Sequence, residues 1–407
     1  MHGLNAFSTD SPNLRTLSCQ TSQHGPDIWF YPDHIKDDLN DADLPKELVN
    51  EILSCAWEYS RCVIPQFTNW ARYIAFTRII VIGTVTEFRG ALVDVTSGDD
   101  ILGYDLQELL DILFKGHPAY DDVSREYRAF LLITGEKSSQ RCESDLFHRY
   151  VEALARSPKD WFRLRDCDAL CRFTVAAALT CNDFDDVWFN EDQLQVIGEL
   201  SDVLYDAVAF YKHRAEGETN NTFAYVDDKL RIESFRRYRE VLWALDVAWA
   251  ESPPHRCVLN FLRPFGGPIH MMMRRYRFIE DGLMIGKPET SEVVRQTRDN
   301  VKLWNRIDAT TEDGEAARYL KVTSQSDKLM FPGLAEMLEN SNKGHCNRCH
   351  YRSSYGAKTS GQFGGVELCS NCRLEWQGYV ESFAARATEV FPVLYSQLSQ
   401  TGVTASS

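Results

Sequence analysis

The sequence contains no long apolar run. A membrane-spanning helix needs about 18 or more consecutive apolar residues, and the most apolar stretch, 73–88, is interrupted by Arg78, Thr84 and Glu87. We therefore predict no membrane span. Residues 1–26 are polar and lack the apolar core of a secretory signal. We expect a cytoplasmic protein whose twelve cysteines are mostly reduced.

Positive charge is also scarce. The 407 residues include 44 Lys and Arg against 59 Asp and Glu, which gives a formal net charge of −15. This excess repels nucleic acid and anionic membrane surfaces in bulk. We predict no nucleic-acid partner, and an anionic substrate would require a local cluster of cations.

Alternating patterns typical of strands are few, whereas helical periodicity recurs along the chain. Apolar stripes at 48–57 and 235–249 have the three- and four-residue spacing of bundle helices. Asn190 and Gln193 form a capping-box pattern, and Pro268 suits a first helical turn. We predict an all-α fold with further helices at 70–94, 105–114, 125–133, 144–155, 190–216 and 291–305.

Composition divides the chain into three parts. Residues 1–28 have little apolar periodicity and predict a disordered tail. Residues 29–335 predict the helical domain. Residues 336–400 predict a separate module, in which a stretch rich in Cys, Gly, Ser and basic residues precedes a last helix at 374–398.

The module contains two CxxC pairs separated by nineteen residues. Each two-residue gap lets both thiolates of a pair face one tetrahedral metal ion. Four thiolates leave no open coordination position, so the pattern predicts a structural zinc site; the alternative is four free thiols. His345 and His350 are substitute ligands. The predicted ligands are Cys346, Cys349, Cys369 and Cys372, and we interpret other cysteines, such as Cys167, Cys171 and Cys181, as core residues.

Two segments resemble the metal and diphosphate motifs of class I terpene synthases. Residues 205–221 match the frame of the second metal motif, in which Asn, Ser and Glu recur every four residues. In this sequence those positions are Tyr205, Ala209 and His213. Further along, Arg275-Tyr276 resembles the Arg–Tyr pair of the same enzymes, in which Arg offers a bidentate fork to phosphate oxygens.

The first metal motif of these enzymes, DDxxD, has one literal match, at 37–41. That match lies in a polar segment with no apolar wall, so we interpret it as a solvated loop or helix start. In the expected apolar helix stand Glu87 and Asp94, seven residues apart and on one helical face. A carboxylate in such a helix needs a partner. Glu87 is therefore the best metal candidate, with a buried salt bridge as the alternative.

The sequence contains the segments 57–65, 87–90, 165–169, 181–183, 205–221, 266–277 and 331–335. Together these segments resemble one family, the fungal α-ionylideneethane synthases. These are sesquiterpene cyclases of the fungal abscisic-acid route, and the family lacks the usual aspartate-rich motif. The resemblance extends from about residue 29 to the last helix and includes the cysteine module.

The resemblance implies a class I-like helical bundle that acts on farnesyl diphosphate with magnesium. It also implies diphosphate ionisation, deprotonation to farnesene-type trienes, and reprotonation with cyclisation. His213 or Glu87 would supply the proton. The implied diphosphate ligands are Arg165, Lys212, Arg274, Arg275 and Tyr276, and the implied magnesium ligands are Glu87, Asp94, Asp183 and Asp206.

Some alternatives stay open at this point. The helix face that carries Asp202, Asp206 and His213 faces either a pocket or solvent. The chain either makes α-ionylideneethane, makes another sesquiterpene, or is a non-catalytic helical scaffold whose zinc module binds a partner.

Overall fold

The computed structural model describes residues 29–139, 141, 144–216, 219–226, 228–273, 315–343, 346–351 and 363–398. Helices dominate these residues, which confirms the all-α class. The predicted tail and the predicted helix at 291–305 lie outside them. So do Arg274, Arg275 and Tyr276.

The first half of the chain forms α1 (Lys46–Val63), α2 (Trp70–Phe88), α3 (Leu106–Phe114), α4 (Tyr120–Lys137), α5 (Asp145–Leu154), α6 (Pro158–Ala169) and α7 (Cys171–Thr180). The second half forms α8 (Glu191–Glu216), α9 (Asp228–Ala248), α10 (Pro253–Leu262), α11 (Pro268–Met272), α14 (Glu315–Thr323), α15 (Ser326–Leu329), α16 (Leu334–Glu339), α17 (Ser370–Glu381), α18 (Phe383–Val390) and α19 (Tyr395–Leu398).

Short 3-10 turns and two small sheets complete the described elements. The turns are η1 (Asp33–Ile35), η2 (Gly90–Leu92), η4 (Thr222–Ala224), η5 (Arg263–Gly266) and η7 (Pro392–Leu394). The strands pair antiparallel, β1 (Asp100–Ile101) with β2 (Tyr104–Asp105) and β3 (His350–Tyr351) with β4 (Val366–Glu367).

Local sequence signals explain where several helices begin. The capping box before α8 is confirmed, because Gln193 N donates to Asn190 Oδ1 at 2.9 Å and Asn190 N donates to Gln193 Oε1 at 3.0 Å. Pro268 begins α11, as predicted. Ser157 caps α6 by accepting from Asp160 N at 3.1 Å.

Two predicted helices are shorter than expected. The predicted helix 70–94 ends at Phe88, because Gly90 packs directly against α4 and a Cβ at Gly90 would lie 2.6 Å from the carbonyl oxygen of Gly135. The predicted last helix 374–398 is instead α17, α18 and α19, separated near Ser382 and by η7 at Pro392. Proline removes a backbone donor and so interrupts helices.

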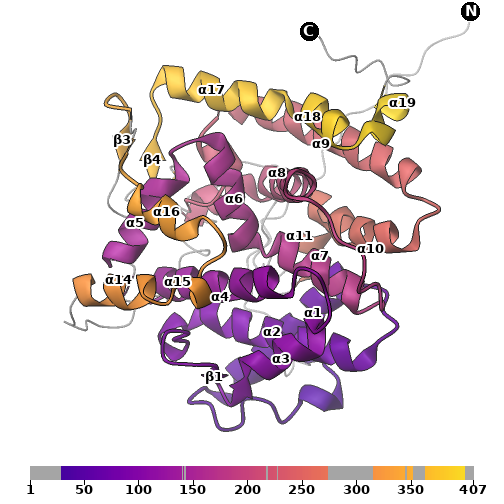
Figure 1. Cartoon of the computed structure of the whole chain (residues 1–407), viewed down its shortest axis with the longest axis vertical. Helices are drawn as coiled ribbons and strands as arrows, with labels where there is room; N and C mark the ends of the chain where they lie inside the picture. The colour runs from indigo at the N-terminus through magenta and orange to yellow at the C-terminus, as the bar shows by residue number, and fades with distance from the viewer. Residues whose placement is uncertain are drawn as a thin grey trace, which may run out of the picture.

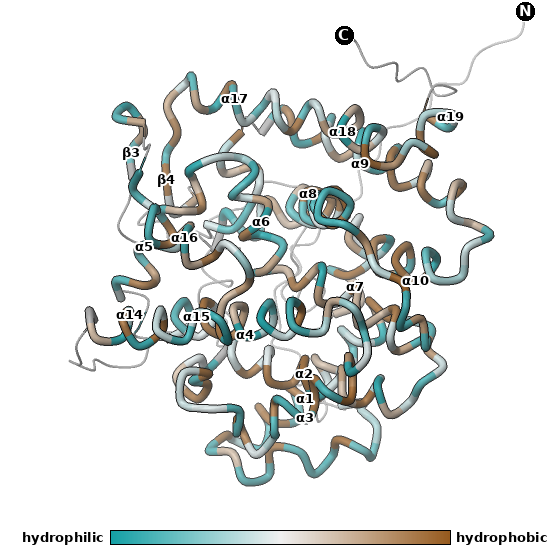
Figure 2. Tube along the Cα trace, in the orientation of Figure 1, coloured by the Kyte–Doolittle hydropathy of each residue, from teal (hydrophilic) through white to brown (hydrophobic). Residues whose placement is uncertain are grey.

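Helix α8 occupies the middle of the molecule (Figure 1) and packs against α6, α7, α9, α10 and α18. Figure 2 shows α2 mostly in hydrophobic colours, whereas α8 carries hydrophilic colour although it lies inside. Helix α16 runs across residues 335 and 336, the predicted boundary of the C-terminal module. None of the described helices combines the length and apolarity required to cross a bilayer.

Candidate active site and metal centre

The polar face of α8 is buried. Relative exposure is 1% for Asp202, 0% for Asp206 and 7% for His213. The face therefore does not point to solvent. Buried polar groups need hydrogen-bonding or ionic partners, so the neighbours of these side chains define what the site can do.

Arg165 of α6 is the cation at the centre of this face. Its Nη2 lies 2.8 Å from Asp206 Oδ1, and its Nη1 lies 2.8 Å from Asp168 Oδ2. Burial opposes its charge, but the carboxylates of Asp206 and Asp168 raise the pKa of Arg165 well above its ordinary value. Arg165 is therefore a permanent buried cation, with two carboxylate partners.

Asp206 is also held by the segment that follows α8. Its Oδ2 accepts hydrogen bonds from Thr222 N at 2.7 Å and from Thr222 Oγ1 at 2.9 Å. Together with Arg165, these contacts account for most of the lone pairs of the carboxylate. The interaction fixes the loop after α8 to the middle of that helix.

Asn221 determines the protonation pattern of His213. Asn221 Oδ1 accepts from Phe223 N at 2.9 Å, so the amide nitrogen must point the other way. That nitrogen donates to the carbonyl oxygen of Asp206 and to His213 Nδ1, the latter at 3.0 Å. His213 therefore accepts at Nδ1 and carries its ring proton on Nε2.

Burial, followed by the charges of Lys212 and Arg165, lowers the pKa of His213 well below its ordinary value. The ring is neutral at neutral pH. Lys212 is itself buried beside His213 and His270. Burial and the charge of Lys212 lower the pKa of His270 to about 3. The ring of Tyr205 lies 4.5 Å from the ring of His270.

We call Arg165, Asp168, Asp202, Asp206 and His213 the central polar cluster. It borders a bend between α6 and α7, where Leu170 adopts a left-handed conformation with φ of 55°. A non-glycine residue in this region is strained, and such strain concentrates at functional sites. The bend brings the backbone N–H of Arg172 to within 3.0 Å of Asp166 Oδ1.

Glu87 lies in the last turn of α2 and is half-buried. Asp94 does not share a helical face with it, because α2 has already ended, and this part of the prediction is wrong. Asp94 accepts from Thr96 and Ser97 and lies 3.5 Å from Arg318. Burial raises the pKa of Asp94, but these contacts outweigh it and lower the value to about 2.

Asp183 lies far from Glu87. Its carboxylate accepts from Thr68 Oγ1 at 2.8 Å and from Asn69 Nδ2 at 2.9 Å. Asn69 caps the start of α2, whereas Glu87 lies at its end, and the rise per residue separates the two positions by about 27 Å. One magnesium ion cannot contact both Asp183 and Glu87.

The literal DDxxD segment has a packing role. Asp38 lies 2.9 Å from Arg78 Nε and accepts from Tyr104 Oη at 2.9 Å. Its side chain joins the N-terminal segment to α2 and β2. Asp38 is therefore largely buried and departs from the interpretation as a solvated loop, whereas Asp37 and Asp41 lie exposed in turns and agree with it.

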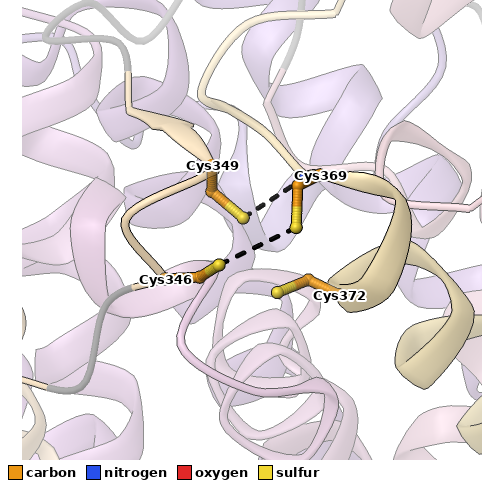
Figure 3. A group of neighbouring side chains, drawn as sticks. All are labelled: Cys346, Cys349, Cys369 and Cys372. Carbon is orange, nitrogen blue, oxygen red and sulfur yellow. Dashed lines mark hydrogen bonds between the residues drawn. The ribbon is translucent and has the colours of Figure 1, made fainter.

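The cysteine pairs converge, as Figure 3 shows. The sulfurs of Cys346, Cys349, Cys369 and Cys372 all lie within 4.8 Å of one another, and those of Cys346 and Cys369 are 3.7 Å apart. A tetrahedron with Zn–S bonds of about 2.3 Å has edges of about 3.8 Å. These four residues, called the four-cysteine group below, therefore suit a zinc ion.

Backbone hydrogen bonds lower the pKa values of Cys346 and Cys369, whereas burial raises those of Cys349 and Cys372. Cys369 N donates to Cys349 Sγ at 3.3 Å. A backbone hydrogen bond from Arg348 lowers the pKa of Cys346 to about 6. The predicted core cysteines Cys167, Cys171 and Cys181 are buried and do not belong to this group, which agrees with their interpretation as core residues.

The C-terminal segment 363–398 packs against α8 and against the loop that holds Asp206. Trp376 of α17 stacks on Tyr225 at 4.6 Å between ring centroids, and Phe363 contacts Phe210 at 5.3 Å. Further along, Arg386 of α18 binds the fully buried Glu199 of α8 at 2.6 Å. This segment is therefore attached to α8 and to the loop after it.

These features define an all-α protein with a buried, charged interior site and a cysteine group able to bind metal. A family model described as "Alpha-ionylideneethane synthase aba3" matches residues 27–393. A protein of that name from Botryotinia fuckeliana is 59% identical over 90% of this chain and 84% of its own length. The α-ionylideneethane synthase abl3 of Leptosphaeria maculans is 56% identical over 93% and 89%.

The chain belongs to the α-ionylideneethane synthase family. The resemblance expected from the sequence is thereby confirmed. Sequence reasoning noticed Arg165 and Asp206 but did not pair them; it included Asn221 only as the end of a motif, and it did not find Thr222. An arginine 41 residues before an aspartate is not a recognisable spacing.

Proposed function

We propose that the chain is a sesquiterpene synthase that converts farnesyl diphosphate to α-ionylideneethane, a precursor of abscisic acid. The observation that carries the proposal is the identity of 56–59% over about nine-tenths of the chain with relatives that bear this name. The central polar cluster supports it, because a buried, permanently charged Arg165 is suited to stabilise a diphosphate leaving group.

In this proposal, Arg165 and Lys212 attract the diphosphate from α6 and α8. Arg274, Arg275 and Tyr276 lie outside the described residues and stay predicted diphosphate ligands. His213 is neutral with its proton on Nε2, so it donates a hydrogen bond rather than a positive charge. Asp206 holds Arg165 and Thr222 in place, which orients the guanidinium for the substrate.

Glu87 is the carboxylate that we propose as a magnesium ligand. Magnesium in phosphate-handling sites commonly binds one or two carboxylates together with substrate oxygens and water. Glu87 is a half-buried carboxylate at the C-terminal end of α2. Asp183 lies at the opposite end of α2 and cannot bind the same ion as Glu87. When bound, magnesium would neutralise the diphosphate as it departs.

Zinc in the four-cysteine group has a structural role in this proposal. Four thiolates complete a tetrahedral shell and leave no position for substrate. The ion would hold the β3–β4 pair and the start of α17 together. Two contacts join this region to the loop 219–226, because Trp376 stacks on Tyr225 and Gly365 packs against Thr219. The zinc ion and the central polar cluster would then be linked through the packing of side chains against this loop.

Product analysis tests this function. Purified protein is incubated with farnesyl diphosphate and magnesium, and the extract is examined by gas chromatography with mass spectrometry. We expect α-ionylideneethane. A different sesquiterpene would establish the alternative synthase, and the absence of any hydrocarbon with magnesium present would favour the non-catalytic scaffold.

A further inference from the structure

A cavity of about 540 Å³ lies between α4, α6, α7, α8 and α16. None of its lining residues belongs to the central polar cluster. Sites for small molecules commonly have volumes of about 300–1,000 Å³. The cavity is therefore large enough for a ligand and is separate from the residues that we propose for the substrate diphosphate.

One part of the cavity lining is apolar. Trp188, Phe189 and Leu194 belong to the segment that leads into α8, and Val123 of α4 and Met337 of α16 add to it. Trp188 and Met337 are only half-buried, so part of their surface is open to a ligand. Aromatic rings and thioethers offer large, adaptable apolar contacts. This part of the cavity suits the apolar body of a ligand.

Most of the carboxylates in the lining are already paired with arginines. The pairs are Glu126–Arg163, Asp122–Arg125 and Asp160–Arg156, with N–O distances of 2.5, 2.6 and 3.7 Å. The buried Glu126 binds both terminal nitrogens of Arg163. A cationic ligand would have to compete with an arginine at each of these carboxylates. The cavity is therefore a poor site for a cation.

Two cations of the lining remain open to a ligand. Lys159 is exposed, and in the part of the chain that the structure describes it has no ion-pair or hydrogen-bond partner. Arg172 is buried, and Asp166 holds its Nε at 2.7 Å. The two terminal nitrogens of Arg172 bind the carboxylate of Glu191 at 2.9 and 3.2 Å. The Glu191 side chain is 65% exposed, so another carboxylate can exchange with it.

We propose that this cavity binds a carboxylate that carries an apolar body, and that Lys159 and the Arg172 guanidinium form the charged end of the site. Glu191 already shows the required chemistry, because its carboxylate occupies the two-nitrogen fork that arginine offers to such groups. In the complex, the ligand carboxylate takes this position and the Glu191 side chain turns to solvent. The apolar body lies on Trp188 and Met337.

The exchange requires little change in the protein. Arg172 keeps its pair with Asp166, so the bend between α6 and α7 stays as it is. Glu191 lies in the first turn of α8, at the surface, where its side chain is free to move. The site goes beyond the proposed reaction and does not depend on it.

Calorimetric titration of the full chain with dodecanoate, kept below its micelle-forming concentration, tests the site. We expect saturable binding. Acetate lacks the apolar body, and dodecyltrimethylammonium has the opposite charge. Each of these probes lacks half of the expected interactions and should bind at least about tenfold more weakly.

Two variants should change the affinity for dodecanoate in opposite directions. Lys159→Gln removes the unpaired cation and should weaken binding about 3- to 10-fold. Glu191→Gln removes the competing carboxylate and should strengthen binding. Lys46→Gln is the matched control, because Lys46 is exposed at the start of α1 and does not line the cavity. All three positions are exposed, so the melting temperatures should stay near that of wild type.

Each other result counts against the site. If dodecanoate does not bind, the cavity is not a ligand site. Binding that is unchanged in Lys159→Gln and Glu191→Gln would place the amphiphile elsewhere in the molecule. Weaker binding in Glu191→Gln would contradict the exchange, and equal binding of dodecyltrimethylammonium would contradict the preference for a carboxylate. These results do not depend on whether the chain forms a hydrocarbon, so the site and the proposed function fail separately.

Discussion

The molecule has two polar centres that the chain builds in opposite ways. The four-cysteine group takes its ligands from two short segments, and each pair spans four residues. The central polar cluster takes its members from α6 and α8 and is held by Thr222 of the following loop, and its contacts join residues far apart in sequence. The difference teaches that a local site can be identified from spacing, whereas a distributed site requires the fold.

The two centres also differ in how they depend on the rest of the protein. A metal ion can organise the four-cysteine group, because four thiolates with one zinc ion form a stable unit. The central polar cluster depends on burial, since its ion pairs are stable only while every buried charge retains its partner. We therefore expect substitutions to have larger effects in the cluster than in the module.

Arg165→Met should have the largest effect. It leaves Asp206 buried without its cation, which typically costs about 3–5 kcal/mol of unfolding free energy. Loss of a preorganised cation should also lower turnover of folded enzyme about 10²- to 10³-fold. Urea denaturation and initial rates measure these effects.

Two further variants sharpen the test of Arg165. The double variant Arg165→Met/Asp206→Asn should lose less stability than the sum of the single variants, because the two residues interact. Arg237→Met is the matched control, since Arg237 forms an exposed pair with Glu233 and should cost about 0.3–0.5 kcal/mol. Additive losses would show that Arg165 and Asp206 are not coupled.

Glu87→Gln should affect chemistry without affecting the fold. We expect product formation to stop and the dependence of rate on magnesium to weaken, while the melting temperature stays near that of wild type. Asp183→Asn is the control at the other end of α2 and should leave turnover unchanged. A destabilised Glu87→Gln protein that remains active would instead indicate the salt-bridge alternative.

Cys346→Ser should affect the four-cysteine group more than the central polar cluster. We expect the variant to lose the single zinc ion per chain found by metal analysis of wild type, and to melt at a lower temperature. Ser370→Ala, next to a ligand but exposed and not a ligand itself, should keep the metal. A zinc-free protein with wild-type stability and activity would contradict the structural role.

Gly365→Ala should give the smallest effect and tests the link between the two centres. Gly365 has φ of 73°, and a Cβ there would lie 2.5 Å from Thr219 Cγ2. Strain and overlap together should cost about 1–3 kcal/mol and weaken zinc retention against a chelator. Gly98→Ala has positive φ but open space around it, so it should leave zinc retention unchanged.

The sequence predicted the parts of the structure that depend on neighbouring residues. The start of α8 followed from Asn190 and Gln193, and the cysteine site followed from two spacings. The end of α2 did not follow, because it depends on the contact of Gly90 with Gly135 of another helix. The apolar pattern of a helix does not indicate which glycine will pack against the backbone of another helix.

The candidate site shows the same limit. His213 was identified from the frame of a family motif, yet its neutral state depends on Asn221, on Lys212 and on burial. Asp202 was visible only as one polar residue on a helix face. That its oxygens have no hydrogen-bond partner among the described residues cannot be read from spacing.

The most direct measurement is a structure of the protein with magnesium, zinc and an unreactive analogue of farnesyl diphosphate. We predict the diphosphate within hydrogen-bonding distance of Arg165 or Lys212, magnesium between the diphosphate and Glu87, and zinc in the four-cysteine group away from the substrate. A diphosphate bound elsewhere, with the central polar cluster unoccupied and unchanged, would contradict the account.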